Sequence, residues 1–440
     1  TGALAGAETA YDAAFARAGI LRANTTEELF QWAKALAYCP RPRGPRVVVL
    51  TNSGGPGVAA TDALEAQGLM LARLSEETRA ALRAILPPFA SVNNPVDMIA
   101  SATVDQFAGC LQHVLADPGV DMVMVISPPP PPTTTGAVVK AMIPLIQTSD
   151  KPVIVTLMGD RLIAEGVELL RAANIPEYRF PEQSASALAA LWRRAQLLER
   201  MAEDPCDDYQ VDRARAAELL AGAAPGEFLS QDAAAGLLQA YGISTLAPVF
   251  AANANEAATA AERLGFPVVV KLDSPDITHK SDVGGVALNL ETAAAVAGAT
   301  VTVMRLGREA RPDARINGVQ VQKMLGAGQE VILGMVRDPQ FGPLMMFGSG
   351  GVEVEGLKDV AFSLAPLSVQ EAGRMLDSTW AGRKLAGFRN LAPADRSAVI
   401  DALVRLAQLA MDFPQIQEIE VNPLRAMGEG AWVIDARARI

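Results

Sequence analysis

Between residues 45 and 200, short apolar runs rich in β-branched residues alternate with turns and with helix-forming stretches. Runs of this length and composition are typical of buried strands. The expected strands are Val47–Leu50, Asp121–Ile126, Lys151–Leu157 and a short edge strand, Ile175–Phe180. Strands that alternate with helices form parallel sheets, because each crossover lays its helix on a face of the sheet. The predicted fold class is therefore α/β, with a doubly wound parallel domain in this part of the chain.

A glycine-rich turn, Thr51–Gly57, follows the first expected strand and leads into a helix expected from Val58 to Gln67. Pro56 fits the first helical turn, where a backbone N–H has no intrahelical partner to lose. Such a turn places backbone N–H groups and the positive end of a helix at one spot. It can serve close packing alone or bind an anion, and its residues do not decide between the two. The candidate phosphate-binding residues are Asn52, Ser53, Gly54 and Gly55.

The second half of the chain is organised around the segment Pro267–Val286, PVVVKLDSPDITHKSDVGGV. Val268–Val270 is expected to be a buried strand that ends at Lys271, and a second strand is expected from Val286 to Leu290. One of the chain's two histidines, His279, lies in the polar loop between them. A glycine pair follows in the loop, and its backbone can approach a phosphate closely. Taken alone, the loop favours an ordinary solvated histidine. Lys271, at a strand end, is well placed to meet a phosphate, and an exposed strand-end lysine is the alternative.

Composition excludes several classes of function. The net charge of −11 argues against nucleic acid as the main partner. No apolar run is long enough to span a bilayer, and no charged start followed by an apolar segment marks an export signal. Cys39, Cys110 and Cys206 are widely spaced and form no C-x-x-C pair, which is typical of reduced thiols in a cytoplasmic protein. With two histidines and no cysteine cluster, a zinc site is not expected.

The loop SPDITHKSDVGGV, residues 274–286, resembles a motif of the NDP-forming acyl-CoA synthetases. This family includes the ADP-forming acetate–CoA ligases and belongs to the succinyl-CoA synthetase superfamily. The match holds together at the Pro, His-Lys-Ser-Asp and Gly-Gly positions. In the family the loop belongs to an ATP-grasp domain, and its histidine is transiently phosphorylated. The resemblance implies this role for His279, whereas His113, in an expected helix, is interpreted as structural.

The same resemblance implies the remaining site residues. They are Lys271, Gln322, Lys323, Met324 and Glu330 for ATP, Gly350 and Gly351 in a glycine-rich turn for phosphate, and Asn422 and Asp435 on successive strands for Mg²⁺. Lys271 would meet a phosphate, the segment 322–324 would be the hinge strand whose backbone pairs with adenine, and Glu330 has no assigned role. The turn at 52–55 resembles the helix start that holds the phosphorylated histidine. Asn94–Asp97 matches a second loop of that domain.

Four segments are expected along the chain. Residues 1–44 resemble the tail of a preceding flavodoxin-like domain, 45–200 a succinyl-CoA-ligase-like flavodoxin-like domain, 201–224 an acidic and alanine-rich linker, and 225–440 an ATP-grasp domain. The first six residues, TGALAG, resemble the segment that follows a Ser-His pair whose histidine is the family's other phosphorylated residue. The resemblance therefore places a CoA-binding domain upstream of Thr1. Truncation is favoured over a separate chain, because a natural start at Thr lacks an initiator Met.

The function implied is that of an ADP-forming acyl-CoA synthetase, an acid–thiol ligase that turns a carboxylate, CoA and ATP into acyl-CoA, ADP and phosphate. The phosphate would pass through His279, with Mg²⁺ bound to the ATP or ADP and with CoA as a substrate. The expected protein is a cytoplasmic homo-oligomer with small-molecule partners, without nucleic acid or membrane. The alternatives are a catalytically silent nucleotide- or CoA-sensing scaffold and the regulatory body of a protein acetyltransferase.

Overall fold

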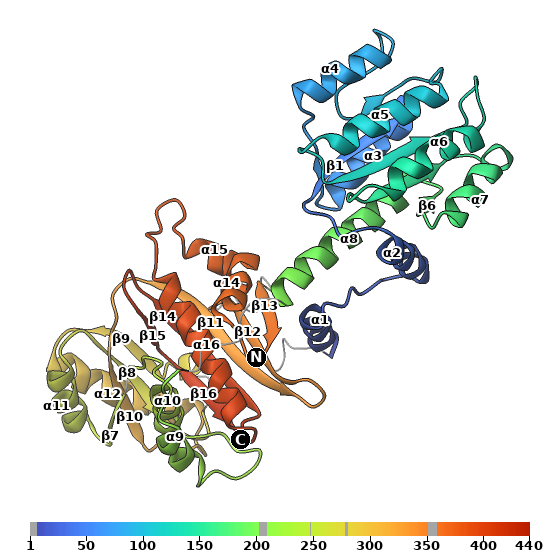
Figure 1. Ribbon diagram of the computed structural model, residues 1–440. Coiled ribbons are helices and arrows are strands. Elements are labelled where there is room, and N and C mark those ends of the chain that lie inside the picture. The colour runs from blue at the N-terminus through green and yellow to red at the C-terminus, as the bar shows by residue number, and fades with distance from the viewer. Residues whose placement is uncertain (1–6, 202–208, 247, 278–279, 351–358) are drawn as a thin grey trace. The chain divides into compact units, whose positions relative to one another are not determined.

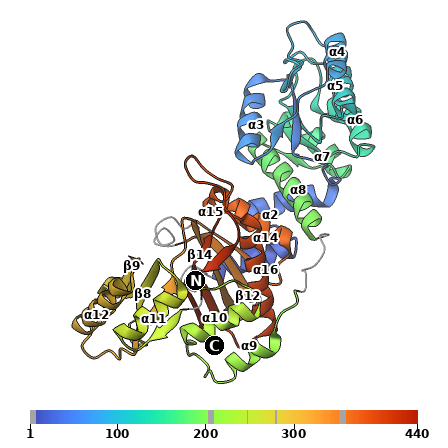
Figure 2. The same cartoon turned by 90° about the vertical axis from the view of Figure 1, so that its left-hand side faces the viewer.

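The computed structural model describes residues 7–201, 209–246, 248–277, 280–350 and 359–440. The chain divides into two compact units. One is Phe15–Glu203, and the other combines Thr1–Ala14 with Asp204–Ile440. Figures 1 and 2 show the elements of each unit from two sides.

The unit Phe15–Glu203 is built on a parallel sheet with the order β2-β1-β4-β5-β6, in which β3 also pairs with β1. Its strands are β1 (Arg46–Thr51), β2 (Met70–Leu71), β3 (Val96–Asp97), β4 (Met122–Ser127), β5 (Val153–Leu157) and β6 (Glu177–Tyr178). With the short β3 set aside, this is the flavodoxin-like order 2-1-3-4-5. The predicted doubly wound parallel domain is confirmed.

Helices cover both faces of this sheet (Figure 1). They are α2 (Thr26–Tyr38), α3 (Gly54–Ala66), α4 (Glu76–Ile85), α5 (Val104–Ala116), α6 (Thr135–Gln147), the 3-10 turn η1 (Arg161–Ile163), α7 (Ala164–Ala172) and α8 (Pro181–Met201). Val48 and Leu50 join the core on the α4–α7 face, whereas Val47 and Val49 join the core on the α2, α3 and α8 face. This alternation follows from the two-residue period of a strand and explains why the runs are apolar throughout.

One boundary differs from the sequence analysis at the glycine-rich turn. Helix α3 begins at Gly54, whereas the sequence placed its start at Val58. Ser53 is the N-cap residue, so most of the expected turn forms the first turn of the helix. Pro56 lies in that turn, as predicted, where its missing N–H costs no intrahelical bond.

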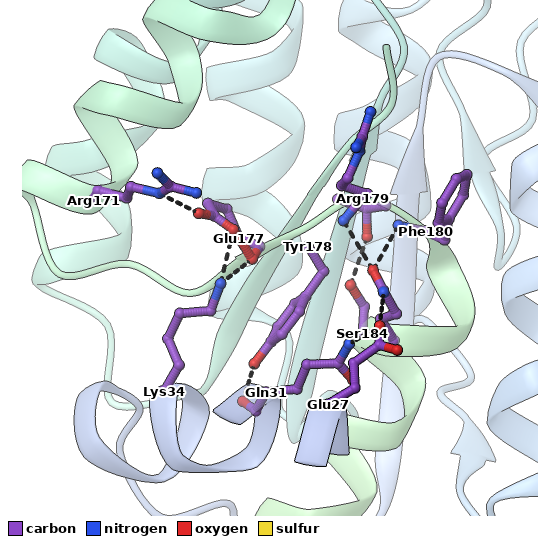
Figure 3. A network of polar contacts seen from close by, with 11 residues as sticks. Glu27, Gln31, Lys34, Arg171, Glu177, Tyr178, Arg179, Phe180 and Ser184 are labelled. Atoms are coloured by element: carbon purple, nitrogen blue, oxygen red, sulfur yellow. Dashed lines mark hydrogen bonds and ion pairs between the residues drawn. The ribbon is translucent and has the colours of Figure 1, made fainter. Parts of the chain in front are cut away.

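Hydrogen bonds and ion pairs hold helix α2 against the rest of the Phe15–Glu203 unit (Figure 3). The buried carboxylate of Glu177 on β6 accepts from Lys34 at 2.8 Å and from Arg171 at 2.7 Å. The Tyr178 hydroxyl donates to the carbonyl of Gln31 at 2.5 Å, and the Lys34 ammonium lies 4.4 Å from the centre of the Tyr178 ring. A buried carboxylate is tolerated when it is paired in this way. Although it lies in the segment expected to be the tail of another domain, α2 is part of the Phe15–Glu203 unit.

Helix α1 (Ala7–Arg17) begins in the other unit. Ala10 packs with Leu344 and Leu364, and Tyr11 makes an edge-on contact with Phe341 at 5.0 Å between ring centres. The described residues of α1 up to Ala14 therefore pack on the sheet of the C-terminal unit. The assignment of residues 1–44 to the tail of a preceding flavodoxin-like domain stays a prediction.

The C-terminal unit contains two antiparallel sheets. The first has the order β7-β10-β8-β9. Its elements are β7 (Val249–Ala251), α11 (Ala254–Leu264), β8 (Val268–Asp273), the 3-10 turn η2 (Lys280–Val283), β9 (Val286–Leu290), α12 (Ala293–Ala310) and β10 (Gly318–Lys323). Strand β9 has the predicted bounds. Strand β8 continues two residues beyond Lys271, which therefore lies within the strand and does not end it.

The second sheet has the order β13-β12-β11-β14-β15, and β16 pairs with β14 further along that strand. Its elements are β11 (Gln329–Asp338), β12 (Gly342–Ser349), β13 (Val360–Leu364), α14 (Val369–Ser378), α15 (Trp380–Lys384), α16 (Arg396–Asp412), β14 (Glu418–Ala426), β15 (Ala431–Val433) and β16 (Ala436–Arg439). Apolar residues of α16, such as Leu403 and Leu406, pack with Leu333 and Phe347 of the sheet.

Two helices precede these sheets in the sequence, α9 (Arg213–Leu220) and α10 (Gln231–Ala240). Ala216 and Leu220 of α9 are buried in the core of the second sheet together with Leu237 of α10. Asp212 caps α9 by accepting from the Arg215 N–H at 2.9 Å. The second part of the segment 201–224, expected to be a linker, is thus a packed helix.

We predict that the two units fold separately and that their boundary lies before α9. Connections between compact units are preferred sites of proteolytic nicking, whereas packed helices are protected. Limited proteolysis should first cut between Glu203 and Asp212, and mass spectrometry should find fragments that end and begin there. First cuts inside β1–α8, or within α9 itself, would contradict this boundary.

Candidate nucleotide-binding site

Lys271 is partly buried on β8, and its ammonium donates to the carbonyl of Ile434 at 3.4 Å. Burial holds the pKa of this ammonium below its ordinary value. The Asp435 carboxylate opposes that shift, and the Lys280 and Arg425 cations add to it. Arg425 is paired with Glu330, so the cations Lys271, Lys280 and Arg425 face the two carboxylates Asp435 and Glu330, and the group carries an excess of one positive charge. Such a group favours an anionic ligand.

The sharp bend between β15 and β16, at Ile434 and Asp435, links the two sheets. The Ile434 carbonyl also accepts from the Gln322 side chain on β10 at 3.4 Å, and the Ile434 N–H donates to Pro423 at 3.0 Å. The Asn422 N–H donates to the Asp435 carbonyl at 3.1 Å. The two residues expected to bind metal are therefore neighbours. Asn422 lies on β14 as predicted, whereas Asp435 lies in the bend and not on a strand.

Gln231, the first residue of α10, lies between two charged groups of the site. Its Nε2 donates to Asp435 Oδ1 at 2.9 Å, and its Oε1 accepts from Lys280 Nζ at 3.0 Å. Lys280 begins η2, directly after the position of His279 in the chain. No role was predicted for either side chain from the sequence, because no motif or spacing marks Gln231.

The segment expected to pair with adenine is held within its own sheet. Gln322 donates to Leu246 at 2.6 Å, and the Met324 N–H donates to Pro267 at 3.0 Å. The Lys323 ammonium binds two carbonyls at the end of α11, at 2.8 and 2.7 Å. These contacts position the start of the hinge, and the pairing with adenine stays a prediction.

A cavity of about 540 Å³ opens where the chain leaves this strand. It is lined by Pro267, Asn289, Met324, Leu325, Gly326, Ala327, Gly328 and Arg425. Of the residues expected to bind ATP, Met324 alone contributes to this lining. The hinge residues after it were missed because a short stretch with two glycines carries no specific motif.

Glu330 on β11 forms an ion pair with Arg425 on β14 at 2.5 Å. Arg425 also donates to the Leu325 carbonyl at 3.4 Å, so it ties the hinge to the second sheet. Its Nε is buried and has no hydrogen-bond partner among the residues that the structure describes. A buried donor without a partner is costly, and a ligand oxygen in the cavity would satisfy it.

The glycine-rich turn after β12 is described only at its base. The Gly350 N–H donates to the Glu330 carbonyl at 3.3 Å, and a Cβ on Gly350 would come within 2.7 Å of the Val331 backbone. Glycine is therefore required there for close approach. His279 and Gly351, two of the predicted site residues, lie outside the described residues.

The other candidate site lies in the Phe15–Glu203 unit, at the carboxyl ends of β1 and β4. The sheet reverses its strand order between these two strands, which is where ligands bind in folds of this kind. Asn52 is buried and donates to Pro128 at 3.2 Å, whereas its Oδ1 has no partner within the described part of the chain. In the same described part, the Ser53 side chain makes no capping hydrogen bond to α3. A Cβ on Gly55 would meet nothing within 4 Å, so the helix start is open.

The loop Asn94–Asp97 borders this helix start. The Asn94 side chain accepts from the Val49 N–H at 2.9 Å and donates to Val47 and Ala72 at 2.8 and 3.0 Å. The Asn94 amide therefore takes the place of a strand backbone, because it forms hydrogen bonds to the backbones of β1 and of the segment after β2. A Cβ on Gly54 would lie 3.2 Å from Asp97 Oδ2, which places a carboxylate beside the first residue of α3.

Comparison with protein families assigns three segments. Residues 221–440 match the ATP-grasp domain, residues 47–202 the Ligase-CoA domain, and residues 1–36 the succinyl-CoA ligase like flavodoxin domain. The acetate–CoA ligase [ADP-forming] I subunit beta of Pyrococcus furiosus is 43% identical over 201 residues, with 46% of this chain and 87% of the subunit covered. The chain belongs to the ADP-forming acetate–CoA ligase family. The predicted family and fold are thus confirmed.

Longer members of the ADP-forming acetate–CoA ligase family match along nearly the whole chain. Acetate–CoA ligase [ADP-forming] I of Archaeoglobus fulgidus is 39% identical over 442 residues, and 4-hydroxybutyrate–CoA ligase [ADP-forming] of Nitrosopumilus maritimus is 33% identical over 444 residues. Both alignments cover 99% of this chain and 63% of the relative. The chain therefore spans somewhat less than two thirds of the length of these relatives.

Proposed function

We propose that this chain carries out the nucleotide half-reaction of an ADP-forming acyl-CoA synthetase, in which ATP and His279 exchange a phosphoryl group. The observation that carries the proposal is the convergence of Lys271, Gln231 and Asn422 on the bend at Ile434 and Asp435. The bend contacts both sheets of the C-terminal unit, through Lys271 and Asn422, and a cavity of about 540 Å³ lined by Met324 and Arg425 lies in the same unit. Lys280, which follows His279 in the loop 274–286, donates to Gln231 at 3.0 Å, and Gln231 donates to Asp435 in that bend at 2.9 Å.

In this reaction the bond between the terminal phosphorus of ATP and its bridging oxygen breaks, ADP leaves, and a phosphorus–nitrogen bond to the imidazole forms. Lys271 and Lys280 would bind the phosphate oxygens, where fixed cations stabilise the charge that spreads over the transferred group. The neutral imidazole acts as the nucleophile. The reverse transfer regenerates ATP.

Asn422 and Asp435 fit a magnesium ion. Their oxygens are the hard ligands that Mg²⁺ prefers, and one or two protein ligands suffice when nucleotide phosphates supply others. The described residues contain no group of three or more His, Cys, Asp or Glu side chains that could hold a metal, so a shared protein–phosphate site suits this chain. When bound, the ion would neutralise phosphate charge during transfer.

The helix start at Asn52–Gly55 would bind the phosphate of a phosphohistidine at the second site of the relay. The N–H groups of the first turn of α3 suit phosphate oxygens. The unpaired Oδ1 of Asn52 and the carboxylate of Asp97 are acceptors that suit an imidazole N–H. At that site an acyl phosphate would form from a carboxylate and react with the thiol of CoA.

The relatives named above act on acetate and 4-hydroxybutyrate, and a further relative, 32% identical over 444 residues, is a trans-feruloyl-CoA synthase. The substrate class proposed here is accordingly a carboxylic acid, with CoA and ATP.

Assembly from several chains is part of the proposal and is supported by the division of the Pyrococcus enzymes into α and β subunits. A cytoplasmic location is proposed as well. Within the described residues, no helix has the length and apolarity that a membrane crossing requires.

The exchange of label between ADP and ATP tests the half-reaction. With Mg²⁺, unlabelled ATP and labelled ADP, the protein should form labelled ATP without any carboxylate or CoA, because transfer to His279 is reversible. Absence of exchange, while ATP binds normally, would favour the silent nucleotide-sensing scaffold.

Asp435→Asn should weaken Mg-ATP binding by about tenfold or more, since it removes a charged ligand of the ion. Binding of metal-free ATP should change much less, because the carboxylate then has no ion to hold. Calorimetry with and without Mg²⁺ measures both affinities. An Asp401→Asn variant on α16, where the carboxylate pairs with Arg405 at 2.7 Å, is the matched control. Equal losses with and without Mg²⁺ would argue against the metal assignment.

A further inference from the structure

One side chain bridges the two charged groups that border the phosphate-transfer site. Gln231 belongs to α10, Lys280 to the turn after the histidine loop and Asp435 to the bend after β15. The Gln231 amide is within hydrogen-bond distance of both, at 3.0 Å from the ammonium and 2.9 Å from the carboxylate. The two hydrogen bonds of Gln231 therefore hold together three segments that lie far apart in the sequence.

Chemistry fixes the orientation of this amide. An ammonium can only donate, so the carbonyl oxygen of Gln231 must face Lys280. An ionised carboxylate can only accept, so the NH₂ group must face Asp435. Both bonds are charge-assisted, which makes them stronger than bonds between neutral groups. The alternative flip of the amide would lose both bonds, and Gln231 therefore holds one orientation.

A neutral amide connects the two groups without altering their charges. A direct ion pair would commit the Lys280 ammonium to Asp435, and each would then be less available to a ligand. With the amide between them, the ammonium keeps two of its three donors for phosphate oxygens, and the carboxylate keeps its second oxygen for a cation. The bridge thus sets the spacing of the two groups while both stay free to bind.

We propose that Gln231 is a positioning residue that holds the end of the histidine loop, through Lys280, against the metal-binding carboxylate of Asp435. The inference rests on the proposed function, because it assigns Gln231 to the magnesium–nucleotide site. Gln231 itself does not touch the reacting atoms. It keeps the Lys280 ammonium and the Asp435 carboxylate at a separation at which a single Mg-ATP can contact both.

Replacement of the amide by an isosteric apolar side chain tests the proposal. In Gln231→Met, the affinity for Mg-ATP should fall about tenfold, since two charge-assisted hydrogen bonds are lost. The affinity for metal-free ATP should fall less, so the gain in affinity that Mg²⁺ provides should shrink. Hydrogen exchange at residues 280–283 should quicken in the protein without nucleotide, because Lys280 has lost its anchor.

The matched control is Gln417→Met in the same unit, where the exposed Gln417 amide donates to the nearby Gln415 carbonyl at 3.4 Å. It should leave both affinities and the exchange of residues 280–283 unchanged. The double variant Gln231→Met/Lys280→Met should bind Mg-ATP no more weakly than Lys280→Met alone, because the two residues act as one unit. If Gln231→Met melts early, Gln231→Ala at this helix start gives the same comparison.

Two outcomes separate this inference from the proposed function. If Asp435→Asn weakens Mg-ATP binding but Gln231→Met does not, the bridge has no positioning role and the inference fails alone. If Mg²⁺ does not alter ATP affinity in the unaltered protein, the proposed function fails as well. Equal losses of both affinities in Gln231→Met would mean a general structural role and would also overturn the inference.

Discussion

Incubation of the protein with Mg²⁺ and γ-labelled ATP should phosphorylate His279, and His279→Ala should abolish the label completely. The chain itself contains Lys271, the hinge cavity and the pair Asn422 and Asp435. It therefore carries the residues that are proposed for the nucleotide half-reaction. A phosphoramidate is acid-labile and base-stable, which distinguishes it from a phosphoester or an acyl phosphate. Excess ADP should discharge the label, because the transfer is reversible.

His113→Ala is the control, since His113 is the only other histidine of the chain. It lies on α5 of the Phe15–Glu203 unit, whereas the proposed nucleotide site is in the C-terminal unit. Labelling in this variant should equal that of the unaltered protein. Label that persists in His279→Ala, or that resists acid, would place the phosphate elsewhere and refute the relay through this loop. Slow labelling of the unaltered protein would indicate that residues outside this chain help to hold the loop near ATP.

The layered architecture could be predicted because it follows from local patterns. Val47–Leu50 and Val268–Val270 are β-branched runs, and the structure places both in buried strands. Gly54 lies in the first turn of α3, and Ser230 caps α10 by accepting from the Ala233 N–H at 3.2 Å. Turn and cap residues act over three or four positions, so the sequence alone reports them.

The contacts of the site could not be predicted in the same way, because they join distant segments. The bond from Gln231 to Asp435 spans 204 positions, and that from Lys280 to Gln231 spans 49. No local rule links such residues, and the family motif includes Lys280 and Asp435 but not the amide between them. The packing of α9 was missed for a related reason. An alanine-rich helix with charged ends resembles a linker until its partners, here the core of the second sheet, are known.

Substitution of Lys271 is expected to have opposite effects on binding and on stability. The ammonium is partly buried on β8 without a direct carboxylate partner in the described structure, where its bond is to the Ile434 carbonyl at 3.4 Å. Its lowered pKa means that the folded protein without ligand disfavours the charged form. In Lys271→Met, ATP affinity should fall about 10- to 100-fold, the usual effect of losing a hydrogen bond between charged groups. The protein without nucleotide should melt at the same temperature as the unaltered protein or higher, because methionine keeps the apolar stem and removes the desolvated charge.

The pH dependence of this stability difference follows from the direction of the shift. The pKa of Lys271 in the folded state lies below its ordinary value of 10.5, so the unfolded chain binds more protons. The free energy of unfolding therefore increases as the pH rises through the folded-state pKa of Lys271. The destabilisation of the fold by the desolvated ammonium is present in full below that pKa and vanishes above about pH 10.5. The advantage of Lys271→Met in melting temperature should accordingly be largest near neutral pH and should narrow toward pH 10.

Lys140→Met is the matched control for both measurements, since Lys140 is an exposed lysine that pairs with Glu165 at 2.8 Å. It should change neither ATP affinity nor the pH dependence of melting. A Lys271→Met protein that binds ATP as before would mean that the phosphates lie away from β8. One that melts far below the unaltered protein at neutral pH would mean that the ammonium stabilises the fold. The combination expected here, weaker binding without a loss of stability, is typical of a side chain whose charge is kept for its ligand. The cost of desolvating that charge is present before the phosphates arrive and is relieved when they bind.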